Sequence, residues 1–321
     1  VQFDDDTQGV GKVYINNAEN PVDILTEINN GIGGRTRIEY GSSAHQDNAF
    51  LPFVIPIVKR VTTSDSLSGN SYTTRYEYKE GLWSAAEREF RGFDEVKVID
   101  PDGNYTISQF HTYDDVRKGR MYYQRAYSSA GEAGQYTWTI NTWTPQDLGN
   151  GVKFVYLSRS SNSYYENNAV KRRTVKDFFY EEPVQLGNLT KVFDWGEIDK
   201  DTWADIGTDA RTIETQYVNN TTGGNYLIGL PQQTVVKDYQ NVQTRQSWFW
   251  YDNNPGLNDL PTRGLLTKKE DWNNNPQGHV NNPVAQYSYN AWGNLMSTPD
   301  ARGKVTTVTY DPVLNLFPLT T

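Results

Sequence analysis

Apolar and polar residues alternate at every second position over many short stretches of this chain. Between Arg35 and Tyr40, threonine, isoleucine and tyrosine share one face, while arginine and glutamate occupy the other. Between Tyr72 and Tyr78, tyrosine and threonine alternate with threonine, arginine and glutamate. A period of two is that of a β-strand, whose successive side chains point to opposite faces. The pattern predicts an all-β, twisted antiparallel fold in which strand far exceeds helix.

Turn residues separate these stretches about every 8–12 positions. Asn29 to Gly34 is glycine-rich and could be taken for a phosphate-binding loop, but it lacks the closing Lys-Ser/Thr and a strand follows it. We therefore interpret it as a hairpin turn. Pro101-Asp102-Gly103 is a second predicted turn, since proline presets φ and glycine accepts a positive φ. The one helix that we expect is short, Asp199 to Thr208, with Asp201 as its N-cap.

The stretch from Gln286 to Asp311 has the form of one complete repeat. A strand ending at Tyr289 leads into a Gly293-Asn294 turn, and a second turn at Asp300 to Gly303 leads into a strand ending in Tyr310-Asp311. The two tyrosines are about two dozen residues apart or slightly fewer, a period typical of stacked supersecondary units. This spacing resembles a tyrosine-aspartate (YD) repeat of the Rhs family.

The composition favours a sheet with a thin core. Hydrophobic residues make up 36% of the 321 residues, and aromatic residues alone make up 13%, with 22 tyrosines. Soluble domains usually have about 45–50% apolar residues. Such a chain suits a sheet with both faces close to water, held by cross-strand pairs of tyrosine, threonine and charged residues.

Charge and cysteine content exclude several classes of protein. The net charge is −9, with lysine and arginine scattered along the chain, so we expect no nucleic-acid partner. Cysteine is absent, which excludes disulfides and cysteine-ligated metals. No apolar run approaches the roughly 18 residues of a membrane span, so we expect no direct membrane span. The chain has no initiating methionine and opens and closes within its pattern, and we interpret it as a segment of something longer.

Two acidic groups suggest chemistry at first sight. Asp4-Asp5-Asp6 lacks the alternating ligands and turn glycine of a calcium loop, which favours a solvated turn over a metal site. Glu181 and Glu182 are neighbours on a predicted strand end and would point to opposite faces, so they cannot flank one glycosidic bond.

Two aromatic stretches can each be interpreted in structural or in functional terms. In Arg88 to Phe93, the sequence Arg-Glu-Phe-Arg-Gly-Phe predicts phenylalanines that pack the sheet and a cross-strand row of charges, with Gly92 permitting a bulge or a close approach. In Thr244 to Asp252, Trp248 and Trp250 share one face, which could form a sugar-stacking platform. Aromatic pairs across a two-sided sheet are the explanation that we favour.

The sequence offers no convincing catalytic set. The three histidines, His45, His111 and His279, each stand alone, and no His-Glu-x-x-His, Gly-x-Ser-x-Gly or Walker motif is present. Asp311-Pro312 lacks the glycine pattern of a self-cleavage site, and we interpret it as a repeat end. We expect no enzyme activity and assign no catalytic, cofactor-binding or metal-binding residue.

Several of these motifs, taken in order, resemble one family. The chain is similar to the middle region of the B component of bacterial insecticidal toxin complexes and to related SpvB-like and Rhs proteins. The resemblance covers most of the chain from about residue 20 onward and is strongest to residue 120 and again from 260 to 318. The motifs are Asn29 to Tyr40, Leu51-Pro52-Phe53, Tyr76-Glu77-Tyr78, Arg88 to Phe93 and Asp102-Gly103.

The resemblance implies a β-sheet wall of Rhs type, a segment of a larger hollow shell that shields a toxic C-terminal polypeptide until delivery. The implied partners are the remaining Rhs shell and that toxin passenger, with a C-type subunit and a translocation pore subunit as further candidates. The implied location is secreted or at the bacterial cell surface. The alternative is a cell-surface adhesion or carbohydrate-binding β-repeat protein.

The expected division of the chain follows from the same resemblance. Residues 1–20 would end a preceding β domain, 21–155 and 156–285 would form the two parts of the middle region, and 286–321 would be a YD repeat truncated at its C-terminus.

Overall fold

The computed structural model describes residues 3–4, 12–13, 23–181, 186–299 and 302–320, and nearly every regular element in it is a β-strand. Two single-turn 3-10 helices, Ser43–His45 and Gly131–Gly134, are the helical elements in these ranges. The all-β prediction is confirmed. The chain divides into two compact units, residues 1–138 with 166–168 and residues 139–165 with 169–321. The four-part division expected from the sequence stays a prediction.

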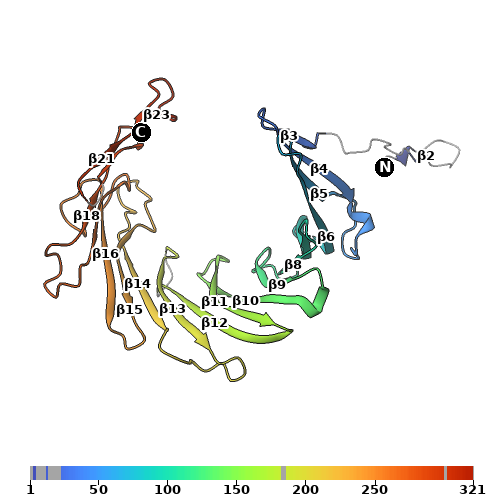
Figure 1. Cartoon of the computed structure of the whole chain (residues 1–321), viewed down its shortest axis with the longest axis horizontal. Helices are drawn as coiled ribbons and strands as arrows, with labels where there is room; N and C mark the ends of the chain where they lie inside the picture. The colour runs from blue at the N-terminus through green and yellow to red at the C-terminus, as the bar shows by residue number, and fades with distance from the viewer. Residues whose placement is uncertain (1–2, 5–11, 14–22, 182–185, 300–301, 321) are drawn as a thin grey trace. The chain divides into compact units, whose positions relative to one another are not determined.

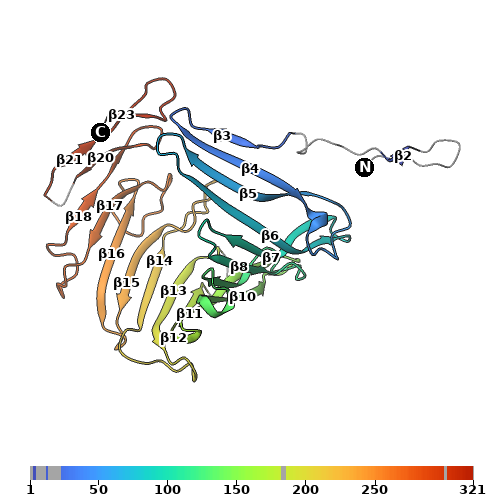
Figure 2. The ribbon, with the colours of Figure 1, turned by 45° about the vertical axis from the view of Figure 1, so that its right-hand side comes forward.

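The first unit is a meander in which each strand pairs antiparallel with the next from β3 to β9. Figure 2 shows β3 to β6 side by side, and the register places Thr36 opposite Thr63 and Tyr76 opposite Val98. The strands are β3 Glu27–Asn29, β4 Gly34–Ser42, β5 Pro56–Asp65, β6 Ser71–Ser84, β7 Glu89–Ile99, β8 Tyr105–Phe110 and β9 Met121–Tyr127, after the short pair β1 Phe3–Asp4 and β2 Lys12–Val13.

The second unit continues the same pattern, with β11 to β18 in chain order and a small sheet of β19, β20 and β21. Strands β13 to β16 run side by side in Figure 1. The strands are β11 Lys153–Glu166, β12 Ala169–Tyr180, β13 Leu189–Ile198, β14 Arg211–Tyr217, β15 Pro231–Lys237, β16 Gln243–Tyr251, β17 Leu266–Asp271, β18 Val284–Gln286, β19 Ser288–Tyr289, β20 Leu295–Pro299, β21 Val305–Thr307, β22 Thr309–Tyr310 and β23 Pro318–Thr320; β10, Gln135–Asp147, contributes to both units.

The hydrophobic core is thin, as the composition predicts. Among the described residues, the buried apolar side chains are spread along the sheet rather than gathered in one layer: Ile57, Tyr127, Val175, Ile198, Ala210, Val218, Val235, Trp248 and Tyr251. Polar cross-strand pairs fill much of the remaining surface. Thr62 and Thr73 lie 3.0 Å apart through their hydroxyls, and Lys79 Nζ lies 2.7 Å from Glu95 Oε1.

Tyrosines at strand ends form a recurring contact. In each, the hydroxyl donates to a main-chain carbonyl of an earlier segment, at 2.7 to 3.0 Å, and a register shift comes directly before the tyrosine. The acceptor carbonyl lies just before β3 in the first case and at the first residue of a strand in the others. We call this set the strand-end tyrosines, counting Tyr40, which lies two residues before the end of β4. The donor–acceptor pairs are Tyr40–Leu25, Tyr217–Leu189, Tyr251–Pro231, Tyr289–Leu266 and Tyr310–Leu295.

The residue after a strand-end tyrosine often organises the next loop. The Asp252 carboxylate accepts the backbone N–H groups of residues 262 to 265, at 2.8 to 3.0 Å. The Asp311 carboxylate likewise accepts those of 313, 314, 316 and 317. Asn290 holds two, from Trp292 and Asn294. In a Tyr-Asp pair, the tyrosine hydroxyl therefore bonds the strand end to an earlier carbonyl, which we call the latch. The aspartate carboxylate bonds the N–H groups of the following loop, which we call the loop clamp. Asp311-Pro312 begins an ordinary turn.

The predicted helix at Asp199 to Thr208 is wrong. The segment is a loop, in which the Asp199 carboxylate accepts the N–H groups of Asp201 and Thr202 and the Thr202 hydroxyl. Trp203 has a positive φ of 62°, which ends any helical turn. Aspartate bonds its own following backbone here and so stabilises a turn in place of a helix.

Candidate functional site

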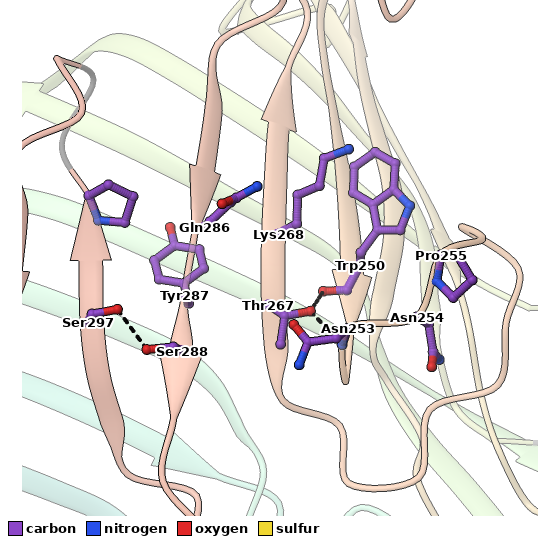
Figure 3. Close-up of a pocket in the computed structure, with 11 residues that line it drawn as sticks. Trp250, Asn253, Asn254, Pro255, Thr267, Lys268, Gln286, Tyr287, Ser288 and Ser297 are labelled. Atoms are coloured by element: carbon purple, nitrogen blue, oxygen red, sulfur yellow. Dashed lines mark hydrogen bonds between the residues drawn. The ribbon is translucent and has the colours of Figure 1, made fainter.

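A hollow on the second unit is a candidate site. It has a volume of about 520 Å³ and is bordered by β16, β17, the β18–β19 junction and β20 (Figure 3). The strand register sets its floor, because Trp250 lies opposite Lys268 and Lys268 lies opposite Gln286. We call this the Trp250 hollow; its other lining residues are Asn253, Asn254, Pro255, Thr267, Tyr287, Ser288, Ser297 and Pro299.

Some polar groups of the Trp250 hollow are already hydrogen-bonded to one another. The Thr267 hydroxyl accepts the backbone N–H of Asn253 at 2.9 Å and lies 3.4 Å from the Trp250 carbonyl. The Ser288 and Ser297 hydroxyls are 2.7 Å apart. These bonds fix the walls, so the hollow is held by the backbone register and by short side chains (Figure 3).

Other polar groups in the hollow have no partner within the described chain. The side-chain amides of Gln286 and Asn253 and the Tyr287 hydroxyl line it without an intramolecular hydrogen bond among the described residues. A concave site with a few convergent polar groups and some apolar wall is the usual form of a small-molecule pocket. The arrangement can therefore offer hydrogen bonds to a ligand without first breaking its own.

The electrostatics of the hollow are close to neutral. The Lys268 ammonium lies 3.7 Å from the centre of the Trp250 ring and 3.2 Å from Glu270 Oε2. Glu270 is 4% exposed and also contacts His279 Nδ1 at 2.7 Å and Asn282 Nδ2 at 2.9 Å. Burial works against the Glu270 carboxylate, but the hydrogen bonds from Asn282, His279 and Lys268 together hold its pKa below the ordinary value. Lys268, the only cation among the described lining residues, thus faces an ionised carboxylate.

The two tryptophans of β16 do not form an open aromatic platform. Trp248 is 5% exposed, and the His279 ring packs against it with centres 4.2 Å apart. Trp250 alone reaches the hollow. No local sequence pattern indicates the contact between His279 and Glu270, because the two lie on a loop and a strand that only the fold brings together.

The Arg88 to Phe93 string differs from its predicted arrangement. Arg91 is the buried member, with a side chain 5% exposed that pairs with Asp115, whereas Phe90 is 36% exposed. Glu89 pairs with Lys118. The predicted cross-strand row of charges is wrong, since both partners come from the loop after β8.

Gly92 in the same string does accommodate a bulge. It has a φ of 90°, and the register there sets Trp83 opposite Phe90 and Gly81 opposite Phe93, so β7 carries an extra residue. The close approach of a neighbour is not seen, since nothing lies within 4 Å of the place where a Cβ would be. The loop after β8 supplies the charged partners of Arg91 and Glu89, which lie on either side of Phe90 in the bulged strand.

The remaining candidates supply no reactive group. Glu181 uses its carboxylate on the N–H groups of Leu186 and Gly187 and on the Asn188 amide. Glu182, Asp5, Asp6 and Asp300 lie outside the described residues, so the acidic turn at 4–6 and the Glu181–Glu182 pair stay predictions. The glycine-rich turn at 29–34 joins β3 to β4, as the hairpin prediction requires.

No metal-binding group of three or more acidic or histidine side chains occurs among the residues that the structure describes. His45 lies in a 3-10 turn, and His111 packs on Tyr122 with ring centres 4.7 Å apart. Within the described ranges, no helix is long and apolar enough to cross a membrane.

Comparisons with known proteins give the chain its relatives. Residues 7–124 match the family model for the middle/N-terminal region of the insecticide toxin TcdB. No curated protein matches the chain. The fold is similar to that in the solved structure of TcdB2–TccC3–TEV, with a TM-score of 0.62 and 15% identity over 92% of this chain and 23% of that chain.

Two further solved structures show the same likeness. TcdB2–TccC3 gives a TM-score of 0.60 with 15% identity, over 92% of this chain and 23% of that chain. The Tc holotoxin pore of Photorhabdus luminescens, with a mutated TccC3, gives 0.63 with 15% identity, over 90% and 22%. The chain spans about a quarter of the length of these proteins. It resembles the B component of Tc toxins, by sequence over residues 7–124 and by fold over most of its length.

Proposed function

We propose that this chain is a structural segment of a toxin complex of the B type. The observation that carries the proposal is the match of residues 7–124 to the TcdB middle region, joined to a fold likeness over 92% of the chain. The solved relatives are assemblies of TcdB2 with TccC3 and a Tc holotoxin pore. A C-type subunit and a larger toxin assembly are accordingly the partners that we propose, with secretion from a bacterium as the setting.

We also propose the finer role of a shell wall that encloses a toxic C-terminal polypeptide. The sheet chemistry supports it, because a wall that meets water on both faces needs polar cross-strand pairs and main-chain latches more than an aliphatic core. Thr62–Thr73 and the strand-end tyrosines supply these. The same proposal gives the segment no enzymatic role.

Protease protection of the passenger tests this function. The full-length protein that contains this segment would be purified with its C-type subunit and treated with a broad-specificity protease. We expect the C-terminal polypeptide to survive until the shell is denatured. Cleavage at the rate of the free polypeptide would rule out enclosure, and failure to copurify with any C-type subunit would rule out the toxin-complex role.

A substitution at Glu89 tests the structural reading against a catalytic one. Glu89→Ala removes a carboxylate that pairs with Lys118 at a half-exposed site. We expect assembly, passenger retention and toxicity to stay near those of the unmodified protein. Loss of toxicity in a fully assembled, loaded complex would instead assign chemistry to this carboxylate.

A further inference from the structure

We propose that the Trp250 hollow binds a neutral saccharide through Trp250, Gln286, Asn253 and Tyr287. The inference concerns a site on the second unit and is independent of the toxin-complex role. It starts from side chains that line one hollow and have no hydrogen bond within the described chain (Figure 3).

The hydrogen-bonding chemistry suits a ligand rich in hydroxyl groups. The Gln286 and Asn253 amides each carry both donors and an acceptor, and the Tyr287 hydroxyl can act as either. A sugar hydroxyl also donates and accepts, so each can be matched in either direction. The Asn254 side chain adds to the rim, where its amide already donates to the carbonyls of Asp259 and Leu260.

The apolar surface of the hollow suits the C–H face of a sugar ring. Trp250 contributes its indole, and Pro255 and Pro299 line the same hollow. The Lys268 ammonium lies over the indole ring, 3.7 Å from its centre, so a sugar would contact the part of the ring that Lys268 leaves uncovered. An aromatic side chain beside amide and hydroxyl groups presents an apolar body and polar contacts together, which a sugar ring can use at the same time.

The charges exclude the other small ligands that such a hollow could hold. Lys268 faces the buried Glu270 carboxylate at 3.2 Å, so an anion such as phosphate would have to compete with an existing ion pair. No carboxylate is among the described residues that line the hollow, so a cation would find no anionic ligand among them. The volume of about 520 Å³ falls within the roughly 300–1,000 Å³ of ordinary ligand pockets.

Saturation-transfer NMR on the whole 321-residue chain tests the proposal, with the methyl glycosides of glucose, galactose, mannose and N-acetylglucosamine as probes. Tryptophan fluorescence titration then measures the affinity of each glycoside that gives a signal. We expect at least one to bind with a Kd on the order of 1 mM.

Gln286→Ala and Trp250→Ala should each weaken that binding by about tenfold or more. Gln286 is exposed on β18, so its replacement leaves the fold intact and tests the site even if Trp250→Ala is unstable. The matched controls are Trp292→Ala, at a tryptophan 72% exposed outside the hollow, and Gln240→Ala in a turn. Both should bind as the unmodified chain does.

Three results would overturn the proposal. None of the four glycosides transfers saturation, or binding survives both Gln286→Ala and Trp250→Ala, or the two control variants lose affinity to the same extent. A Gly-Ser-Asn tripeptide that binds where the glycosides do not would also refute it and would assign the hollow to a peptide.

Discussion

At the residue scale, a single tyrosine hydroxyl group holds a strand end to an earlier part of the chain. Tyr251 is 7% exposed, and its hydroxyl donates to the Pro231 carbonyl at 2.8 Å. Burial raises the pKa of Tyr251 to about 12, so the group stays a donor throughout the physiological range. The same contact at Tyr217 is 2.7 Å long, although no aspartate follows that tyrosine. The latch is thus a property of the strand end, and the Tyr-Asp motif is one version of it.

Tyr251→Phe tests the latch directly. It removes one hydrogen bond and leaves the half-buried Pro231 carbonyl without that donor, which typically costs about 1–2 kcal/mol of the free energy of unfolding. The measurement is chemical denaturation of both proteins. Tyr239→Phe is the control, because Tyr239 is 50% exposed, and it should change stability little. Equal effects of the two substitutions would show that the hydroxyl at 251 is not special.

Asp94 should give the opposite response to pH from most carboxyl groups here. Burial, helped by the charge of Glu80 on β6, raises the pKa of Asp94 above its ordinary value, against a hydrogen bond from Thr112. The folded state then binds this proton more tightly than the unfolded state, so the free energy of unfolding falls as pH rises through the interval between the two pKa values.

Asp94→Asn removes that penalty. We expect the variant to melt at a higher temperature than the unmodified chain at pH 7, with the difference shrinking as the pH falls to about 4. Thermal unfolding monitored by circular dichroism at both pH values measures this. Asp102→Asn, in an exposed turn, is the control. A variant less stable at pH 7 than the unmodified chain would contradict the assignment.

At the scale of one element, β7 carries a buried positive charge whose negative partner lies in the loop after β8. The Arg91 guanidinium is enclosed, its Nε has no partner among the described residues, and its counter-charge is the exposed Asp115. Removing only the partner of a buried charge is more harmful than replacing the charge by an apolar group.

Asp115→Ala should therefore lower the free energy of unfolding by about 1–3 kcal/mol, and Arg91→Met by less than about 1 kcal/mol. Phe90→Ala should cost less than the roughly 3–5 kcal/mol of a fully buried ring, since Phe90 is 36% exposed. Urea denaturation of the three variants ranks them. An Arg91→Met variant that loses as much stability as Asp115→Ala would contradict the prediction and would show that Arg91 contributes mainly through its ion pair.

The second prediction for a single element concerns the loop clamp at Asp252. Asp252→Ala deprives the N–H groups of residues 262 to 265 of their acceptor, and we expect hydrogen exchange there to quicken by more than about tenfold. Asp252→Asn keeps one acceptor oxygen and should give an intermediate rate. Amides of β13 should keep their exchange rates in both variants, and a general increase would point to global destabilisation.

The strands and turns could be predicted from the sequence because alternation and turn chemistry are local. Thr36 and Tyr76 lie in the strands that the period of two predicts, and Gly92 lies at a bulge. The loop at Asp199 was missed because an aspartate before a polar run can cap a helix or fold its own turn. The Trp250 hollow could not be predicted, because it depends on register across several strands and on where β18 ends.

For the whole molecule, acid should act first on the second unit. Hydrogen bonds from Arg159, against burial, lower the pKa of Asp177. Burial opposes the ionised form of Asp194, but the Gly196 N–H and Arg211 outweigh it, and its pKa is lowered too. A lowered pKa contributes stability above the ordinary carboxyl pKa, and that stability is lost as pH falls through the folded value.

We expect hydrogen exchange to show loss of protection in β12, β13 and β17 below about pH 4. Asp194→Asn should flatten this dependence, since its partners no longer face a titrating group. Protection in these strands that is unchanged at pH 3 would contradict the prediction. The raised pKa of Asp94 gives the first unit one contribution of the other sign.

The strand-end tyrosines have a consequence for how such a sheet can evolve. Each one donates a hydrogen bond to a main-chain carbonyl, which is present whatever side chain the acceptor residue carries. Mutational drift on the faces of the strands therefore leaves the register intact as long as the tyrosine and its bulge persist.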